Sequence, residues 1–421
     1  MRKLLLLGLA ACGDDSPVMP DAGPMEPIQV HVQFSDDAPA PGIDIVFHDA
    51  SGEVISVAKT GSDGIVETDD PAVRMVTMTS IDPDDGRHRV WTKTGLRGGD
   101  TPWFTLYVDS GQPPAFMAEV AITLPPNPPG GATTFAIDFG CEGTSGGATT
   151  LTYTMLNDCR RPGTNELDVV ALAKNGDTVT GYTFMKAVPI VTGGTTQFDF
   201  PTGWKSDPLQ VVAQFSNPPA GVTQGRLSMG GSVGGHAYYP FTSQTASVPP
   251  GPSRSYMIAR GFYSTLSHSL ELDYGGKGWA FIVESATAPT TNSVTQFDLG
   301  STVLPDITGA TLADAMTTRP TIEWTQTGAH DGAAGGYAGF EWTGGGWVLE
   351  IPPDDATSVR IPALPAEKAA FLPPTDGSLM APYVQFQRYS YEPTYADHLA
   401  HHGLFTGEEY STVITRFPSY F

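Results

Sequence analysis

Short runs of alternating apolar and polar residues recur along most of the chain. The first, IQVHVQF at 28–34, places Ile28, Val30, Val32 and Phe34 on one face. Because successive side chains of a β-strand point to opposite faces, this alternation predicts a half-buried strand. Similar runs, bounded by turn-forming Gly, Pro, Asp and Ser, lie at 43–49, 53–60, 65–68, 74–81, 133–139, 149–156, 166–174, 180–191, 195–200, 209–215, 255–264, 269–274, 279–286, 321–327, 339–351, 359–365, 383–389 and 411–417. We therefore predict an all-β protein, with several antiparallel β-sandwich domains in tandem.

Helical patterns are rare in this sequence. Only 306–316 and 393–402 are candidates for short helices. Gly (48) and Pro (37) together make up 85 of the 421 residues, whereas average usage is about one residue in eight. This excess has no G-X-Y period, so it favours many turns and excludes both a collagen and a helical bundle.

The charge balance is strongly acidic. The chain has 22 Lys and Arg residues against 45 Asp and Glu residues, and its formal net charge is −23. A nucleic acid or an anionic membrane surface attracts basic proteins, so this balance excludes a nucleic-acid partner and a polybasic membrane contact.

The first residues read MRKLLLLGLAACGDD. A basic start and a short apolar run precede small residues and Cys12, which is the order of a cleaved signal peptide. Leu9-Ala10-Ala11-Cys12 resembles the lipobox of bacterial lipoproteins. That resemblance implies cleavage before Cys12 and its acylation, with palmitate among the attached chains. The alternative is an ordinary signal peptide with an incidental cysteine.

Residues 12–27 are acidic and rich in proline, so we expect an extended tether after the signal peptide at 1–11. Gly13 follows the cysteine, where the best-known sorting rule for lipoproteins places Asp to retain a protein at the inner membrane. We therefore expect an envelope protein anchored by lipid, at the outer membrane or the cell surface.

Two further cysteines remain, Cys141 and Cys159. An exported chain folds in an oxidising compartment, where an even pair predicts a disulfide bond. Closing that loop stabilises the fold by about 3 kcal/mol in the chain-entropy model. Free thiols, a metal site and a redox pair are the alternatives.

One stretch resembles a known family. PGIDIVFHDASGEVISVAKTGSDGIVE is similar to the carboxypeptidase regulatory-like domain, a transthyretin-like sandwich; the matching positions are Pro41-Gly42, Ser51-Gly52, Thr60, Asp63-Gly64 and Gly98-Gly99-Asp100. The resemblance implies a β-sandwich over 28–124 with a stalk or accessory role, and it carries no catalytic residues.

LPPNPPGG at 124–131 is typical of a semi-rigid linker. We expect a second β-sandwich region at 132–290, formed by one domain or two, and a third domain at 294–421 that resembles Ig-like or fibronectin III-like sandwiches. The fragment TQFD occurs at 196–199 and again at 295–298, a hint of a repeated strand.

Two fragments match G-x-S-x-G, around Ser145 and Ser232, and His236 follows the second. A nucleophile elbow needs a strand, a tight turn and a helix. Neither fragment is followed by a helical pattern, so we interpret both as Gly-rich loops and expect no catalytic residues.

Two sets of residues are weak candidates for metal ligands. His398 and His402 stand at the i, i+4 spacing that zinc sites use on a helix, and Asp82, Asp84 and Asp85 form an acidic loop of the kind that binds Ca²⁺. A solvated turn and a hairpin loop are the readings that we favour for them.

Three tryptophans are weak candidates for a ligand platform, because flat aromatic rings stack on the apolar faces of sugars. They are Trp324, Trp342 and Trp347. Their alternation in strand patterns favours core packing over a platform.

These observations predict a lipid-anchored envelope or surface protein with a binding, adhesion or scaffolding role, without cofactors and not an enzyme. The expected partners are the membrane, through the lipid anchor, and a protein or polysaccharide ligand. Two alternatives stay open: a carbohydrate-binding module, and a hydrolytic or carbohydrate-active enzyme whose site is assembled from scattered residues.

Overall fold

The computed structural model describes most of the chain after residue 25. The described ranges are 26–35, 37–106, 118–140, 142–155, 159–161, 163–218, 220–234, 236–238, 244–246, 253–274, 279–302, 304–330, 332–354, 356–400 and 410–417. Strands dominate these ranges, so the predicted all-β class is confirmed. Among the described residues, no helix is long and apolar enough to span a bilayer.

Residues 28–106 form a sandwich of seven strands, which we call the first repeat. Its three-stranded sheet has the order β4 (Ile65–Thr68), β1 (Ile28–Phe34) and β7 (Trp103–Leu106). Its four-stranded sheet has the order β3 (Val54–Lys59), β2 (Asp44–His48), β5 (Met75–Ile81) and β6 (His88–Lys93). The central strand β1 is antiparallel to β4 and parallel to β7. Buried residues such as Val30, Phe47 and Met78 fill the space between the two sheets.

The same strand order recurs at 118–199, the second repeat. One sheet has the order β11 (Thr150–Met155), β8 (Ala118–Thr123) and β14 (Thr195–Asp199). The other has the order β10 (Gly143–Gly146), β9 (Thr134–Asp138), β12 (Glu166–Asn175) and β13 (Thr178–Pro189). Again the first strand is antiparallel to the fourth and parallel to the seventh.

The third repeat, at 209–298, follows the same plan. One sheet has the order β19 (Ser253–Ile258), β15 (Leu209–Ser216) and β22 (Ser293–Asp298). The other has the order β17 (His236–Tyr238), β16 (Gln224–Val233), β20 (Thr265–Asp273) and β21 (Trp279–Thr287), and β18 (Gln244–Ala246) also pairs with β16. The recurring TQFD fragments occupy β14 and β22, which are the equivalent final strands of their repeats, each parallel to its central strand.

The fourth repeat, at 307–417, departs from this plan in one strand. One sheet has the order β23 (Ile307–Ala313), β24 (Thr321–Gln326) and β27 (Ser358–Arg360). The other sheet has the order β26 (Gly345–Ile351), β25 (Gly335–Trp342), β28 (Tyr383–Tyr389) and β29 (Tyr410–Phe417). Here an initial antiparallel strand, β23, replaces the final parallel strand. The short helices are η1 (Pro129–Gly131), α1 (Leu299–Thr302), η2 (Ala366–Phe371) and α2 (Tyr395–Ala400).

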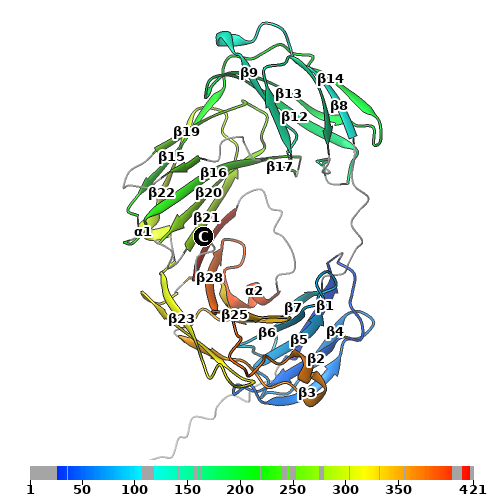
Figure 1. The fold of residues 1–421 in the computed structure, drawn as a ribbon, viewed down its shortest axis with the longest axis vertical. Coiled ribbons are helices and arrows are strands. Elements are labelled where there is room, and N and C mark those ends of the chain that lie inside the picture. Colours follow the sequence, from blue (N-terminus) through cyan, green and yellow to red (C-terminus); the bar gives the residue numbers. More distant parts are fainter. Residues whose placement is uncertain are drawn as a thin grey trace, which may run out of the picture.

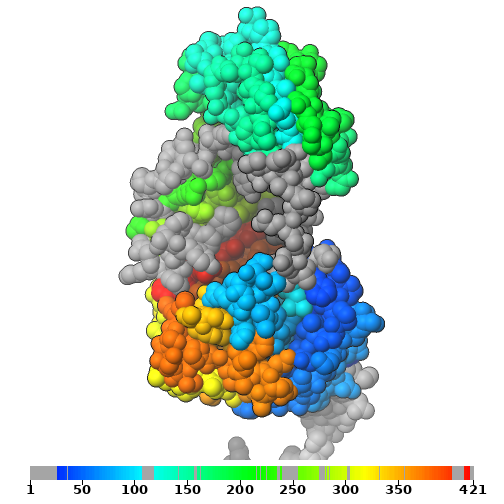
Figure 2. Space-filling model, turned by 45° about the vertical axis from the view of Figure 1, so that its right-hand side comes forward, coloured from blue at the N-terminus to red at the C-terminus, as the bar shows by residue number. Residues whose placement is uncertain are grey.

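Three of the four-stranded sheets join edge to edge. β21 of the third repeat pairs antiparallel with β29, and β6 of the first repeat pairs parallel with β26. Together with β18 they make one thirteen-stranded sheet, so the first and last repeats are neighbours although they stand at opposite ends of the sequence (Figure 1). In the space-filling view the first repeat, in blue, packs against the fourth, in yellow to orange (Figure 2).

The second repeat keeps a separate four-stranded sheet. It contacts the third repeat through side chains, because Ala136 and Val170 share a buried cluster with Tyr238 and Phe262. The Tyr238 hydroxyl also donates a hydrogen bond of 2.9 Å to the Asp168 carbonyl oxygen.

Several sequence expectations change in the structure. The segment 306–316, a candidate for a short helix, contains strand β23, which pairs with β24. The other candidate, 393–402, contains helix α2. The proline-rich segment 124–131 connects β8 and β9 within the second repeat, where Trp204 Nε1 donates a hydrogen bond of 2.8 Å to the Pro125 carbonyl.

Strand β8, which the prediction placed in the first domain, pairs with β11 and β14. β22, which it placed mostly in the last domain, pairs with β15.

The Gly-rich fragment around Ser232, which the sequence analysis interpreted as a loop, lies largely in β16. Glycine is required there because a Cβ at Gly231 would lie 2.5 Å from the ring of Tyr263 and 2.9 Å from the Thr265 carbonyl oxygen. The glycine thus lets the Tyr263 ring lie against the strand.

Candidate ligand-binding groove

Three of the predicted site residues, Cys12, Cys141 and His402, lie outside the described residues. Cys159 is fully buried and belongs to the core cluster of the second repeat together with Phe139. Its disulfide bond with Cys141 stays a prediction, as does the acylation of Cys12.

The three candidate platform tryptophans are buried. Trp324 and Trp342 are each 5% exposed and Trp347 is 0% exposed. Trp347 Nε1 donates a hydrogen bond of 3.0 Å to Thr92 Oγ1 on β6, so this ring fixes the contact between the first and fourth repeats. The three rings therefore pack largely in the core, although Trp347 and Trp324 each border a surface hollow.

The acidic loop at 82–87 joins β5 to β6 and is closed by its own hydrogen bonds. Asp82 Oδ1 accepts the Asp84 backbone N–H at 3.0 Å. The other Asp82 oxygen pairs with Arg89 Nη2 at 3.1 Å, and Asp85 Oδ2 lies 3.4 Å from the same nitrogen. In the described part of the chain, no group of three His, Cys, Asp or Glu residues is arranged to hold a metal ion.

His398 lies on α2 and its side chain is only 4% exposed. Its Nδ1 is 2.6 Å from Glu392 Oε2, and its Nε2 is 3.8 Å from Glu350 Oε1. Glu350 in turn binds Lys93 across the joint between β26 and β6, with 2.6 Å between Nζ and Oε2. The histidine therefore belongs to a buried polar cluster where the first and fourth repeats meet.

The two candidate nucleophiles lie on strands and not in the loops expected for them. Ser145 is exposed on β10. Ser232, on β16, places its Oγ 2.7 Å from Thr265 Oγ1. Neither position has the strand–turn–helix geometry of a nucleophile elbow.

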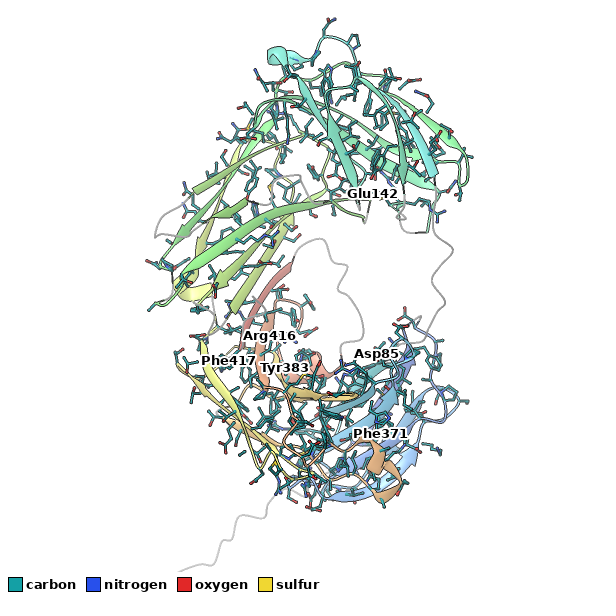
Figure 3. The ribbon with its side chains drawn as sticks, in the orientation of Figure 1. Asp85, Glu142, Phe371, Tyr383, Arg416 and Phe417 are labelled. Carbon is teal, nitrogen blue, oxygen red and sulfur yellow. The ribbon has the colours of Figure 1, made fainter. Side chains whose placement is uncertain are left out.

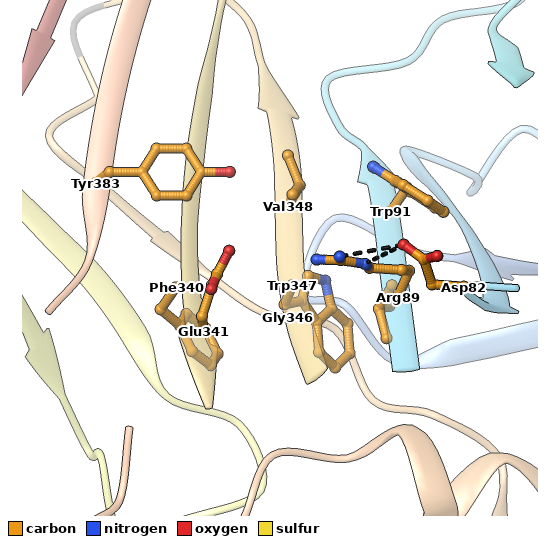
Figure 4. Close-up of a pocket in the computed structure, with 10 residues that line it drawn as sticks. Asp82, Arg89, Trp91, Phe340, Glu341, Gly346, Trp347, Val348 and Tyr383 are labelled. Atoms are coloured by element: carbon orange, nitrogen blue, oxygen red, sulfur yellow. Dashed lines mark hydrogen bonds and ion pairs between the residues drawn. The ribbon is translucent and has the colours of Figure 1, made fainter. Parts of the chain in front are cut away.

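A groove that the sequence analysis did not foresee crosses the joint between β6 and β26. It consists of two hollows, of about 170 and 280 Å³, which share Trp91 and Val348 in their linings. Figure 4 shows the smaller hollow, with Trp91 and the Asp82–Arg89 pair on one side and Tyr383 on the other. We call this combined feature the seam groove.

Residues of both joined strands line the seam groove. Arg89, Trp91 and Lys93 alternate on β6 with Val90 and Thr92, which are buried. Val348 and Glu350, the partners of Trp91 and Lys93 in the parallel ladder, line the groove beside them. Val90 packs in the buried cluster that contains Trp347, whereas Trp91 packs against the buried cluster of the first repeat, and both border the smaller hollow.

Aromatic rings form the walls of the seam groove. Trp91 and Trp103 are half-buried and both line the larger hollow. The Trp103 ring stacks on His31, with 4.3 Å between the ring centroids. On the opposite wall Tyr383 lies under the Arg416 guanidinium, 4.7 Å from the ring centroid. Figure 3 places Tyr383 and Arg416 on the fourth repeat, and Asp85 across from them on the first.

Polar groups at the deep end of the seam groove are desolvated. The Lys93 and Glu350 side chains are each 8% exposed. Tyr395 donates hydrogen bonds from its hydroxyl to the Thr94 and Glu350 carbonyl oxygens, at 2.9 and 3.1 Å. Burial, with a further contribution from the Glu350 charge, raises the pKa of the Tyr337 and Tyr395 hydroxyls well above their usual value.

Glycines keep the smaller hollow open. A Cβ at Gly339 would lie 2.6 Å from Tyr383 Oη, so any side chain there would displace the tyrosine. A Cβ at Gly346 would have room, since its nearest neighbour would be Glu341 Cγ at 3.5 Å, but it would occupy the groove.

Sequence reasoning missed these residues for a physical reason. In the run RHRVWTK at 87–93, Trp91 shares its face with the charged residues Arg89 and Lys93. Neither face is therefore purely apolar, and the run does not show the pattern of a half-buried strand. An aromatic residue flanked at i±2 by cations was the available signal.

Comparison with known proteins gives no family. No family model matches the chain, and no curated protein matches it. The Bacillus anthracis TIE protein is 7% identical with a TM-score of 0.15; the match covers 65% of this chain and 50% of that one. The Streptococcal ancillary pilin is 8% identical with a TM-score of 0.15, and the match covers 64% of this chain and 98% of that one. The pilus adhesin SpaC from Lactobacillus rhamnosus GG is 8% identical with a TM-score of 0.13, and the match covers 78% of this chain and 44% of that one. At these TM-scores the likenesses carry no argument about fold or role.

Proposed function

We propose that this chain is a lipid-anchored protein of a bacterial envelope, exposed at the outer membrane or cell surface, whose work is binding without catalysis. The lipobox at Cys12 supports the anchor, and the net charge of −23 supports a partner other than nucleic acid. A disulfide bond between Cys141 and Cys159 fits the same compartment.

The seam groove is the observation that carries the binding role. Its walls come from two repeats whose sheets are continuous across the β6–β26 ladder, and its position is fixed by the Lys93–Glu350 and Trp347–Thr92 contacts. Preorganised walls lower the entropy cost of binding. A groove held in this way suits a ligand that must be retained at a surface.

Two measurements test this proposal in the native host. A palmitate analogue should label the wild type, and the protein should be degraded by protease added to intact cells. The Cys12→Ser variant should lose the label and leave the membrane fraction. Equal labelling of both proteins would end the anchoring proposal.

The binding role is tested separately with purified Cys12→Ser protein. Fluorescently tagged protein should bind to isolated envelopes or to neighbouring cells in a saturable manner, and unlabelled protein should compete. Binding that rises linearly without saturation would contradict a specific binding role.

A further inference from the structure

We propose that the seam groove binds a neutral glycan chain and covers about two adjacent sugar units. This inference rests on the binding role proposed above and names its ligand class. The alternatives are an anionic glycan or a protein segment, and three features of the groove favour the neutral glycan.

Charge is the first feature. The ionised side chains at the groove balance in sign, because four cations stand against four carboxylates: Arg87, Arg89, Lys93 and Arg416 against Asp82, Asp85, Glu341 and Glu350. The groove therefore offers no net charge to an ionic ligand, and the acidic chain as a whole repels polyanions. A ligand that matches this pattern is uncharged.

The second feature is the combination of aromatic faces with fixed polar groups. A sugar ring has an apolar face, which packs on an indole, and a rim of hydroxyls that both donate and accept hydrogen bonds. Trp91 lies between the two hollows, and the Asp82–Arg89 pair provides a carboxylate and a guanidinium beside it. The stacking of Trp103 on His31 holds a second indole in the larger hollow.

Size and openness are the third feature. Neither hollow alone reaches about 300 Å³, the lower end of typical small-molecule sites, but the two together do. They lie in line along the strands and share Trp91 and Val348, so a ligand that fills both is elongated. A chain of linked sugars has this shape.

The test is calorimetric titration of the purified Cys12→Ser protein with neutral hexasaccharides: cellohexaose, maltohexaose, chitohexaose and mannohexaose. A hyaluronan hexasaccharide serves as the anionic comparison. We expect at least one neutral probe to bind and the anionic probe not to bind. Failure of all four neutral probes, or binding of hyaluronan alone, would overturn the glycan assignment.

Variants locate the site. Trp91→Ala should weaken binding about ten-fold, the loss expected for one stacked aromatic contact. Gly346→Ala should also weaken binding, and because its added Cβ makes only ordinary contacts it should leave the fold intact. Trp204→Ala is the matched control, because Trp204 is a half-buried tryptophan packed against the core of the second repeat, and this variant should bind as the parent protein does. Unchanged affinity in both groove variants would refute the proposal.

The two proposals can fail separately. Saturable attachment to envelopes that persists without any saccharide binding would refute the ligand class and leave the binding role standing. Loss of both would refute both.

Discussion

Asp138 is the buried acid with the clearest consequence for stability. It lies on β9, facing the contact between the second and third repeats, and it is 4% exposed. Its Oδ1 accepts the Gly140 N–H at 2.8 Å, whereas Oδ2 accepts no hydrogen bond from any described residue. Burial raises the pKa of this carboxyl from 3.8 to about 7. Tyr238 and Tyr263 lie close enough for the Asp138 charge to raise their own pKa values.

The sign and size of the effect follow from linkage. The folded state keeps the proton to higher pH than the unfolded chain, so stability falls as the pH rises from about 4 to about 7. At about 1.4 kcal/mol per pKa unit, the loss is about 4 kcal/mol. Asp138→Asn removes the titration, so its stability relative to wild type should rise by about this amount between pH 4 and pH 8.

Pulse-labelling hydrogen exchange across a urea series is the suitable assay, because peptides from β9 and β12 report on the second repeat alone. Comparing the two pH values cancels any constant cost of placing the asparagine N–H₂ in this site. Asp199→Asn on the exposed β14 surface is the control. A wild-type stability that does not change between pH 4 and pH 8, or an Asp138→Asn effect that is equal at both, would refute the reasoning.

Three further results are expected. Lys93→Met should lower the free energy of unfolding by about 3–5 kcal/mol, because the buried Glu350 carboxylate loses the ammonium that pairs with it at 2.6 Å. In thermal melts the double variant with Glu350→Leu should recover most of the loss, and no recovery would contradict this account. Gly231→Ala should destabilise by about 1–3 kcal/mol in urea unfolding, because the new Cβ overlaps a tyrosine ring. Mass spectrometry of the unreduced protein should find a peptide pair joining Cys141 to Cys159, and free thiols at both positions would end that prediction.

Local pattern predicted most of the strands but few of their partners. The alternation at 28–34 matches the bounds of β1, because one face is buried and the other partly open. The segment 306–316 misled the prediction because ADAM resembles a helix locally, whereas Ile307 to Ala313 pairs with β24 in the fold. Tertiary pairing overrides such weak propensities.

The seam groove was beyond sequence reasoning for a different reason. It exists because β6 pairs with β26, more than 250 residues later in the chain, and no local pattern encodes that contact. The same holds for Glu350, which reads as an ordinary strand residue until Lys93 lies 2.6 Å away. The TQFD fragments were the one visible trace of the repeated architecture.

The β6–β26 ladder also decides how the molecule carries mechanical load. Consider a force applied between residue 28, at the start of β1, and a ligand in the seam groove. Only the first and fourth repeats would transmit that force. The second and third repeats lie outside that path, as a side loop of the chain. Within the first repeat, β1 is held along its length by β4 and β7. Tension along β1 therefore loads the hydrogen bonds of both ladders together, in shear, instead of breaking them one by one.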